Sequence, residues 1–459
     1  MSQKFQLSEK ESINLRNDDF TVIGTLLDRT AVYIRKDDKA EILLLNAGMQ
    51  TEKRITLSNI HEGFDNIHFN CMSRQLLIFY EVKENKNLNV YGMSLGENFS
   101  VSEPKQLNSS AVGQFRNNTE YTYAYSADHR RTLIYTHFKV EGQLVLQAVV
   151  IDDNLNELKR YDQLLNLDDL VIDDMAAISN EGNPYILLTD KMAYKGNAEQ
   201  ISILSGSGSA TEMKPVNIDL KKHEVTEVKF LIDNPNGNLY LAGLYSEGRY
   251  SAPRGIYFAV FDEKQNVLKS EHFVALSMQV SNGKADLRDM KVKGVSLKSD
   301  GGIEVVTEKY YQNVRTLTTA SPTMGIGMMS MPDNTRTINE FNYDEIILFN
   351  IKPEGGIAWT QVILKEQMST DDGGIYLSFG QLEHKLGKVF IFNDLNSSNK
   401  RLMASYVSMK GETSIKELQT NEQVDDWNLM PRSARQVSKS AIVMPCVMKN
   451  NLCFLKISY

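Results

Sequence analysis

The sequence has few cysteines, the residues that stabilise small domains covalently, and no apolar run long enough to cross a membrane. Its 459 residues include 3 Cys, 10 Pro and 2 Trp. No apolar run approaches the roughly 18 residues of a membrane-spanning helix. No CxxC or Cys/His spacing indicates a zinc site. A chain of this length buries a core large enough to fold without disulfides or metal ions.

Basic residues are in the minority. The chain has 50 Lys and Arg against 58 Asp and Glu, a formal net charge of −8, with both signs interspersed. A nucleic-acid backbone demands a basic surface, so we expect no nucleic-acid partner. The beginning, MSQKFQLSEKES, is polar and acidic and does not resemble a signal peptide. We therefore expect either an exported protein whose signal has been removed or a cytoplasmic protein.

Helical periodicity is nearly absent, and a repeated hairpin takes its place. No stretch keeps an i, i+3, i+4, i+7 apolar stripe for three turns. Instead, a short apolar strand, a polar turn and a second apolar strand return eight times. The first strands of these hairpins are Thr30–Arg35, Gln75–Val82, Thr132–Val140, Pro184–Asp190, Asn238–Tyr245, Ile303–Tyr311, Lys388–Asp394 and Ala441–Met448. Most of the second strands lead through a Gly, Asn or Asp turn into a further, more polar strand.

These hairpins predict an all-β protein built from one repeated unit. Most begin about 45 to 60 residues after the previous one, and four short antiparallel strands at such a period are typical of a β-propeller blade. We expect one β-propeller domain over residues 1–459 with eight blades, or seven if the weakly patterned first 60 residues form something else. The last hairpin ends at Tyr459 without a fourth strand, so we expect the N-terminal stretch Phe5–Leu15 to close the last blade.

One interval between hairpins is much longer than the others. It contains residues 312–342, rich in Thr, Ser, Gly and Asn, which we interpret as an inserted flexible loop on one face of the propeller. The apolar residues in this loop are Met324, Ile326, Met328, Met329 and Met331. Unbranched Met side chains suit an adaptable contact surface, so these five residues are our candidate partner-binding site. The alternative is a loop whose Met side chains fold back on the blade.

Signals of chemistry are weak. The chain has no G-x-S-x-G nucleophile motif, no glycine-rich phosphate loop and no D-x-D-x-D-G calcium loop, so we predict no catalytic, cofactor-binding or metal-binding residue. Asp371–Gly374 could hold a cation or form a plain turn. Tyr121, Tyr123 and Tyr125 alternate onto one face of a strand, which suits either a platform for a sugar ring or ordinary packing.

The cysteines allow one geometric prediction. A tight turn centred on Lys449–Asn450 would place Cys446 and Cys453 directly opposite each other on paired strands. Opposed Cβ atoms lie about 4.5–5.5 Å apart, so either a disulfide or two buried free thiols would fit.

One segment resembles a known family. The run Tyr343–Asp394 resembles a family of largely uncharacterised envelope proteins of Bacteroidota. The features that carry the resemblance are Tyr343-Asp344 opening an apolar strand, the turn and tryptophan of Ile351–Trp359, the Asp372–Gly374 loop, the closing Phe390–Asp394 and the tail from Pro431. The resemblance implies a periplasmic or outer-membrane-associated propeller. One member type is an accessory that closes the periplasmic mouth of the type IX secretion translocon.

Two functions follow as expectations. The first is a non-catalytic interaction protein that docks on an envelope or outer-membrane protein through loops at one face. The second is a carbohydrate-active or ligand-binding propeller with its site at the central channel. The second function requires Tyr121, Tyr123 and Asp371 to face one common pocket.

Overall fold

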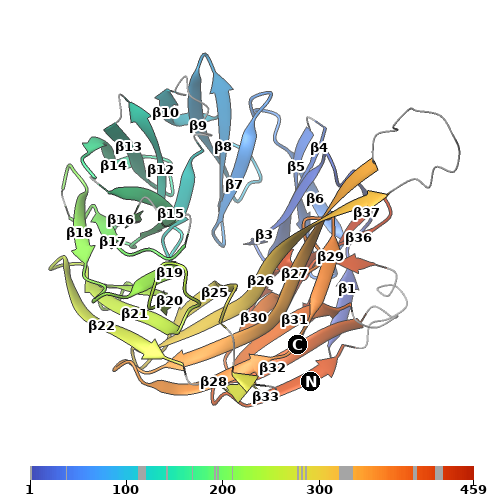
Figure 1. The fold of residues 1–459 in the computed structure, drawn as a ribbon. Helices are drawn as coiled ribbons and strands as arrows, with labels where there is room; N and C mark the ends of the chain where they lie inside the picture. The colour runs from blue at the N-terminus through green and yellow to red at the C-terminus, as the bar shows by residue number, and fades with distance from the viewer. Residues whose placement is uncertain are drawn as a thin grey trace, which may run out of the picture.

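The computed structural model describes residues 3–459 except 38, 112–119, 141–142, 168, 191–192, 194–195, 209, 277–278, 281–282, 285–286, 320–333, 396–400 and 419–426. The described chain is all β, and its strands, apart from one short separate pair, form eight antiparallel sheets that follow one another around a ring (Figure 1). The ring confirms the predicted β-propeller and its eight blades. None of the described residues belongs to a helix long and apolar enough to cross a membrane.

The first four blades follow chain order from the centre of the ring outwards. Blade 1 contains β3 (Asp19–Leu26), β4 (Arg29–Lys36), β5 (Lys39–Leu45) and β6 (Thr51–Thr56). Blade 2 contains β7 (Asp65–Cys71), β8 (Leu76–Glu84), β9 (Asn87–Leu95) and β10 (Lys105–Ala111). Blade 3 contains β11 (Thr122–Tyr125), β12 (Arg131–Val140), β13 (Gln143–Asp152) and β14 (Glu157–Leu165). Blade 4 contains β15 (Leu170–Ile178), β16 (Pro184–Asp190), β17 (Ile201–Ser205) and β18 (Lys214–Ile218).

The other four blades complete the ring. Blade 5 contains β19 (Glu224–Asp233), β20 (Asn238–Ser246), β21 (Gly255–Asp262) and β22 (Val267–Ala275), followed by the separate pair β23 (Gln279–Val280) and β24 (Gly283–Lys284). Blade 6 contains β25 (Met290–Leu297), β26 (Ile303–Thr319), β27 (Asn334–Ile351), β28 (Ile357–Ile363) and β29 (Gln367–Thr370). Blade 7 contains β30 (Gly380–His384), β31 (Gly387–Asp394), β32 (Arg401–Ser408) and β33 (Thr413–Glu417). Blade 8 contains β34 (Asn428–Leu429), the 3-10 turn η2 (Pro431–Ser433), β35 (Arg435–Ser438), β36 (Ala441–Met448), β37 (Asn451–Ser458), β1 (Lys4–Leu7) and β2 (Glu11–Ser12).

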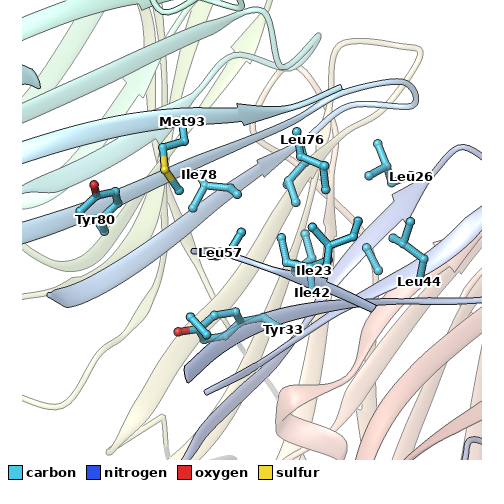
Figure 2. Close-up of a cluster of buried hydrophobic side chains, with 14 of the residues drawn as sticks. Ile23, Leu26, Tyr33, Ile42, Leu44, Leu57, Leu76, Ile78, Tyr80 and Met93 are labelled. Carbon is cyan, nitrogen blue, oxygen red and sulfur yellow. The ribbon is translucent and has the colours of Figure 1, made fainter. Parts of the chain in front are cut away.

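The eight hairpins expected from the sequence are the second and third strands of the eight blades. These strands read as continuous apolar runs because neighbouring blades cover both of their faces. Figure 2 shows this packing between blades 1 and 2, where Ile23, Tyr33 and Ile42 meet Leu76 and Ile78 in one buried cluster. Each fully buried side chain of this size contributes about 1.5–3 kcal/mol, so packing between blades holds the ring together.

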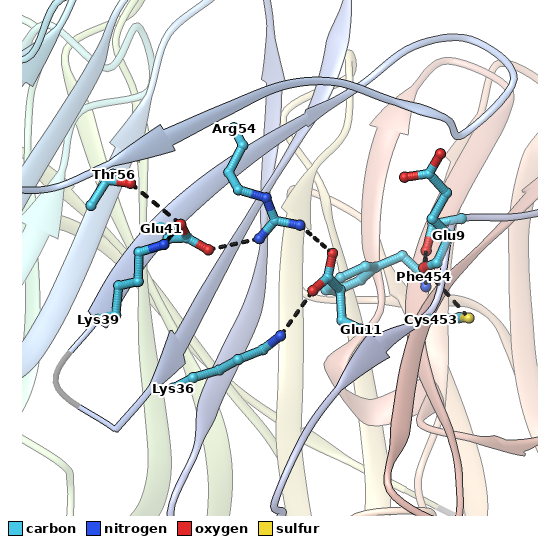
Figure 3. A network of polar contacts seen from close by, with 10 residues as sticks. Glu9, Glu11, Lys36, Lys39, Glu41, Arg54, Thr56, Cys453 and Phe454 are labelled. Carbon is cyan, nitrogen blue, oxygen red and sulfur yellow. Dashed lines mark hydrogen bonds and ion pairs between the residues drawn. The ribbon is translucent and has the colours of Figure 1, made fainter.

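The N-terminal segment closes the ring, as predicted. Strand β1 pairs with β37 from Lys4↔Ser458 to Leu7↔Leu455, and β2 pairs with the same strand at Glu11↔Leu452. Figure 3 shows the Glu11 carboxylate between Lys36 and Arg54 of blade 1. The closing segment thus covers the edge of β37 and also ties blade 8 to blade 1.

The boundaries expected for the inserted loop, 312–342, are wrong. Strands β26 and β27 remain paired through most of it, from Gln312↔Phe341 to Thr319↔Asn334. The physical reason is the β-branched content of these flanks, because Thr and Val favour the extended backbone. Met324, Ile326, Met328, Met329 and Met331 lie at 320–333, outside the described residues.

Candidate protein-interaction site on blade 6

The two longest strands of the molecule extend beyond the blade to which they belong. Strand β25 pairs with β26 only as far as Met290↔Lys309, and a register shift between Glu308 and Tyr310 marks this point. We call Tyr310–Leu317 of β26 and Arg336–Tyr343 of β27 the blade-6 finger. In Figure 1 these gold and orange strands continue past the ends of β25 and β28. A β-bulge bends and twists a strand. Here Asp344 and Glu345 of β27 lie opposite Lys309 of β26, and this bulge sets the direction of the finger.

The two edges of the finger differ. Strand β29 covers the β27 edge, with pairs from Tyr343↔Gln367 to Glu340↔Thr370. In the described part of the chain, no strand pairs with the other edge beyond Lys309 of β26. That edge therefore presents a row of unpaired backbone groups.

The register shows which residues supply these backbone groups. The N–H of Tyr310 donates to the carbonyl oxygen of Asp289 over 2.9 Å, so it faces away from β27. Backbone direction alternates along a strand, and no further register shift follows in β26. The N–H and C=O groups of Gln312, Val314 and Thr316 therefore face the open edge.

The side chains around the open edge are exposed and carry little charge. Val314 is 62% exposed and Leu317 is 52% exposed. The one charged residue of the edge strand here, Arg315, is bound through Nε to the Glu340 carboxylate over 3.0 Å. Proteins usually protect an exposed strand edge with free charges, proline or bulges, and residues 312–317 contain none of these.

Other edges of the ring do carry such protection. The outer strand β6 carries exposed Lys53 between the ion-paired Glu52 and Arg54. The outer strand β18 contains Lys214 and Pro215, both exposed. The open edge of the finger is therefore unlike these outer edges.

A buried ion pair holds the base of the finger. Glu308 of β26 is fully buried; its carboxylate lies 2.9 Å from Nζ of Lys365 and 3.4 Å from Nζ of Lys293, and it accepts a 2.6 Å hydrogen bond from Ser378 Oγ. Lys365 Nζ also donates to the carbonyl oxygen of Tyr343 over 3.0 Å. Together, the contacts of Glu308 and Lys365 join β26 and β27 to the segments that follow β28.

The buried charges of Glu308 and Lys365 make the base of the finger sensitive to substitution. Burial lowers the pKa of Lys365, and the neighbouring Glu308 carboxylate opposes that shift. Removing one partner of a buried ion pair is strongly destabilising, whereas the intact pair contributes little net stability. We interpret the pair as a device that fixes the orientation of the finger on blade 6.

The tyrosines considered as a sugar platform are packing residues. The Tyr123 ring stacks on His68 with centroids 4.1 Å apart, and its hydroxyl donates to Glu81 over 3.3 Å. Tyr121 is buried, and Tyr125 lies against Phe79 in the same cluster between blades 2 and 3. Burial raises the pKa of Glu81 to about 7. These side chains fill the space between two blades.

Asp371 lies elsewhere, beside the finger. Its carboxylate accepts the N–H of Asn339 over 2.9 Å and lies 3.5 Å from an Arg336 nitrogen. The next carboxylate, Asp372, accepts the N–H of Gly374 over 2.8 Å. Asp371–Gly374 is therefore a turn whose carboxylates are occupied. Asp371 lies beside β27 of blade 6, whereas Tyr121 and Tyr123 lie between blades 2 and 3. Across the described residues, no group of three or more His, Cys, Asp or Glu side chains is placed to hold a metal ion.

The two C-terminal cysteines lie directly opposite each other, as predicted. The register pairs Cys446 with Cys453, and both thiols are free. Burial raises the pKa of Cys446 well above its ordinary value. A buried thiol with a raised pKa is a poor nucleophile, so these residues act as core side chains.

Comparisons with known proteins add little to this geometry. No family model matches the sequence, and no curated protein matches it. A prolyl endopeptidase structure has 9% identity and a TM-score of 0.37, with 88% of this chain and 46% of that chain covered. This chain thus spans about half the length of that endopeptidase. An uncharacterized protein of Listeria monocytogenes has 13% identity and a TM-score of 0.34, with 90% and 99% covered.

A third structure, a polysaccharide lyase acting as an ulvan lyase, has 10% identity and a TM-score of 0.33, with 76% of this chain and 90% of that chain covered. TM-scores this low carry no argument about function. The class of the protein follows from its own strand topology: it is an eight-bladed β-propeller closed by its N-terminal strands.

Proposed function

We propose that this propeller is a non-catalytic interaction protein that binds another protein through the blade-6 finger. The observation that carries the proposal is the open β26 edge. No strand among the described residues pairs with the backbone groups of Gln312, Val314 and Thr316 at this edge, and the edge lacks the usual protection against strand pairing.

The mode of binding follows from the chemistry of that edge. An extended segment of the partner adds to β26 as a further strand, and its main chain hydrogen-bonds to these three residues. Exposed Val314 and Leu317 lie on opposite faces of the ribbon and offer apolar contacts to alternate side chains of the partner. The fixed base at Glu308 and Lys365 lowers the entropy lost on binding, because the edge is already oriented.

The identity of the partner rests on the sequence resemblance of Tyr343–Asp394. We propose an envelope or outer-membrane protein as the partner, and a periplasmic or outer-membrane-associated location for the propeller. In the most specific form of the proposal, the propeller is an accessory or plug subunit of an outer-membrane protein secretion translocon. The same resemblance supports each of these statements.

The test uses a proline that affects only the open edge. Because the Val314 N–H faces away from β27, Val314→Pro keeps the β26–β27 ladder, removes one outward donor and places a ring against an incoming strand. Val314→Thr is the matched control, since it keeps the donor and the β-branched shape. Each full-length variant is purified with its partner from gently solubilised envelopes, and the partner is identified and then titrated as a pure protein.

We expect Val314→Pro to weaken the purified partner's binding at least tenfold, while Val314→Thr stays within about threefold of wild type. Circular dichroism and the melting temperature establish that both variants are folded. Equal affinity for all three proteins would contradict docking at this edge. Stoichiometric self-association that Val314→Pro abolishes would also contradict the proposal, because the edge would then bind a second copy.

A further inference from the structure

The seam between blades 4 and 5 is held differently at its two ends. At the end where β16 finishes, Arg249 of the β20–β21 loop lies 2.9 Å from the carboxylates of both Asp190 and Glu199 in blade 4. Opposite charges therefore face each other across this end of the seam. At the other end, where β16 begins and β21 finishes, the described residues form no ion pair between the two blades.

Glu263 lies at this second end, directly after β21. Only 5% of its surface is exposed. Its Oε1 atom is inaccessible to solvent and makes no hydrogen bond within the described residues. Burial without a partner disfavours an ionised carboxylate much more than a neutral carboxyl group.

The charges that act on Glu263 are themselves acidic. Glu181 lies in the β15–β16 turn of blade 4, and Asp233 and Asp262 lie at the ends of β19 and β21 in blade 5. Burial raises the pKa of Glu263 to about 7, and the charges of these three carboxylates contribute to the shift. A proton on Glu263 therefore relieves a repulsion that crosses the seam.

Two cations follow Glu263 in the chain, and neither of them pairs with it. The Lys264 side chain is exposed, and the Lys269 ammonium group lies 2.8 Å from the Asp262 carboxylate. An ionised Glu263 would thus remain without a counter-charge.

An apolar contact closes the seam next to Glu263. Tyr185 of β16 and Phe261 of β21 are fully buried, and their ring centroids lie 6.4 Å apart. The Tyr185 hydroxyl makes no hydrogen bond in the described part of the chain. Burial raises the pKa of Tyr185, and the nearby Glu263 charge adds to that shift, so the phenol stays neutral. Ionised Glu263 would therefore place an uncompensated charge beside this contact.

A proton is the ligand that suits this site. The Glu263 Oε1 and the Tyr185 hydroxyl are both inaccessible, so a molecule or a hydrated ion has no room beside them. A proton binds to the carboxyl group itself and needs no cavity. The free energy that closes this end of the seam consequently depends on pH.

We propose that Glu263 is a pH-sensitive switch at the seam between blades 4 and 5. The protonated form keeps the contact of Tyr185 with Phe261 closed. In the ionised form, repulsion from the neighbouring carboxylates favours opening of this end, while Arg249 holds the other end. The seam is tightest at acid pH and loosens as the pH rises through about 7. This switch is independent of the blade-6 finger and goes beyond the proposed docking function.

Hydrogen exchange of the full-length protein, followed by mass spectrometry, tests the switch. Protection is measured from pH 5.5 to 8 and corrected for the intrinsic exchange rate of each peptide. A carboxyl group with a pKa of about 7 in the closed state and 4.5 in the open state changes the opening equilibrium by about 25-fold over this range. We expect β16 and β21 to lose protection by up to that factor. Protection of β16 and β21 that stays constant over this range would overturn the proposal.

Glu263→Gln removes the titration and keeps the shape of the side chain. We expect its β16 and β21 to be protected almost independently of pH and, at pH 8, better than in wild type. Glu271→Gln is the matched control, because Glu271 of β22 is also buried in blade 5 but lies 3.0 Å from Lys221. It should weaken protection at every pH and keep the wild-type pH dependence. A wild-type pH dependence in Glu263→Gln would contradict the switch.

A second variant tests the repulsion without changing a buried residue. Glu181 is exposed, so Glu181→Gln should leave the fold intact. It removes one negative charge that acts on Glu263 and should move the midpoint of the loss of protection to lower pH. The effect is measured at low ionic strength, where salt does not screen it. A midpoint that stays at the wild-type pH would contradict repulsion across the seam.

Discussion

Two strand edges of this molecule differ in whether another strand covers them. The edge of β37 in blade 8 is covered by β1 and β2, which come from the far end of the chain. In the part of the chain that the structure describes, no strand covers the edge of β26 in the blade-6 finger, although β29 covers the other side of the same ribbon. Both edges expose the same backbone chemistry, so the difference lies in what covers them. In our proposal, the ring is a closed scaffold and the finger is the part that receives a strand of another protein.

The largest effect is expected from opening the closed edge. Deletion of Met1–Leu15 removes β1 and β2 and the buried side chain of Ile13, whose loss alone corresponds to about 2–5 kcal/mol. An unpaired β37 edge would then favour association between molecules. We expect a marked fall in melting temperature and aggregation on size-exclusion chromatography. A truncated protein that stays monomeric and equally heat-resistant would remove the basis of the comparison.

The next effect concerns the base of the open edge. Glu308→Gln leaves the buried Lys365 ammonium without its principal counter-charge and is expected to reduce the free energy of unfolding by about 3 kcal/mol. Replacing both residues, Glu308→Gln with Lys365→Met, should recover most of that loss. Denaturant unfolding measures each variant. Glu345→Gln is the matched control, because its pair with Lys309 is wider, at 3.8 Å, and partly exposed. Equal losses of unfolding free energy in Glu308→Gln and Glu345→Gln would show that the buried pair contributes no more than a partly exposed one.

A third effect distinguishes the ring from the finger, because the stability of the ring is expected to depend on pH. The pKa of Glu81 is about 7 in the folded protein against an ordinary value of 4.5, so between these pH values the folded state holds a proton that the unfolded chain has lost. This carboxyl's stabilising contribution is complete below about pH 4.5 and is lost as the pH rises through 7, a change of at most about 3 kcal/mol.

Glu81→Gln should therefore flatten this part of the stability–pH curve, which thermal unfolding from pH 4.5 to 8 would show. Partner binding at the finger should not follow the same curve, because Glu81 lies between blades 2 and 3. An unchanged pH profile in the variant would contradict the role assigned to Glu81.

The smallest effect is expected at the ion pairs of the closing seam. Glu11→Gln removes the links to Lys36 and Arg54 but keeps the β2–β37 pairing, so we expect a loss of about 1 kcal/mol. The loss should shrink at high salt, because these groups are partly exposed. A loss as large as that of the deletion would mean that charge, rather than strand pairing, closes the ring.

Much of the ring could be predicted from the sequence, because its apolar strands and turns are patterns of a few neighbouring residues. Runs such as Gln75–Val82 are apolar because neighbouring blades cover them, and the unpaired last hairpin indicated the closing role of the N-terminal stretch. The opposition of Cys446 and Cys453 followed from one short turn. Each of these inferences needed only a few neighbouring residues.

The blade-6 finger and its base depend on contacts between residues that are distant in sequence. Residues 312–319 are polar enough to suggest a loop, although the alternation of Val314 with Thr316 and Thr318 was a strand signal that could have been used. The ion pair of Glu308 with Lys365 joins parts of the chain that no local pattern connects. Which edge stays open is a property of the assembled sheet and is not visible in a single strand.

Hydrogen exchange of the backbone amides in β26 tests the central claim most directly. We predict an alternating pattern in the free protein, measured by NMR: Asn313, Arg315 and Leu317 face β27 and exchange slowly, whereas Gln312, Val314 and Thr316 exchange fast. Binding of the partner should then protect the fast set as well. Uniform slow exchange across residues 312–317 of the free protein would show that the edge is already covered, and the account of an open docking strand would be wrong.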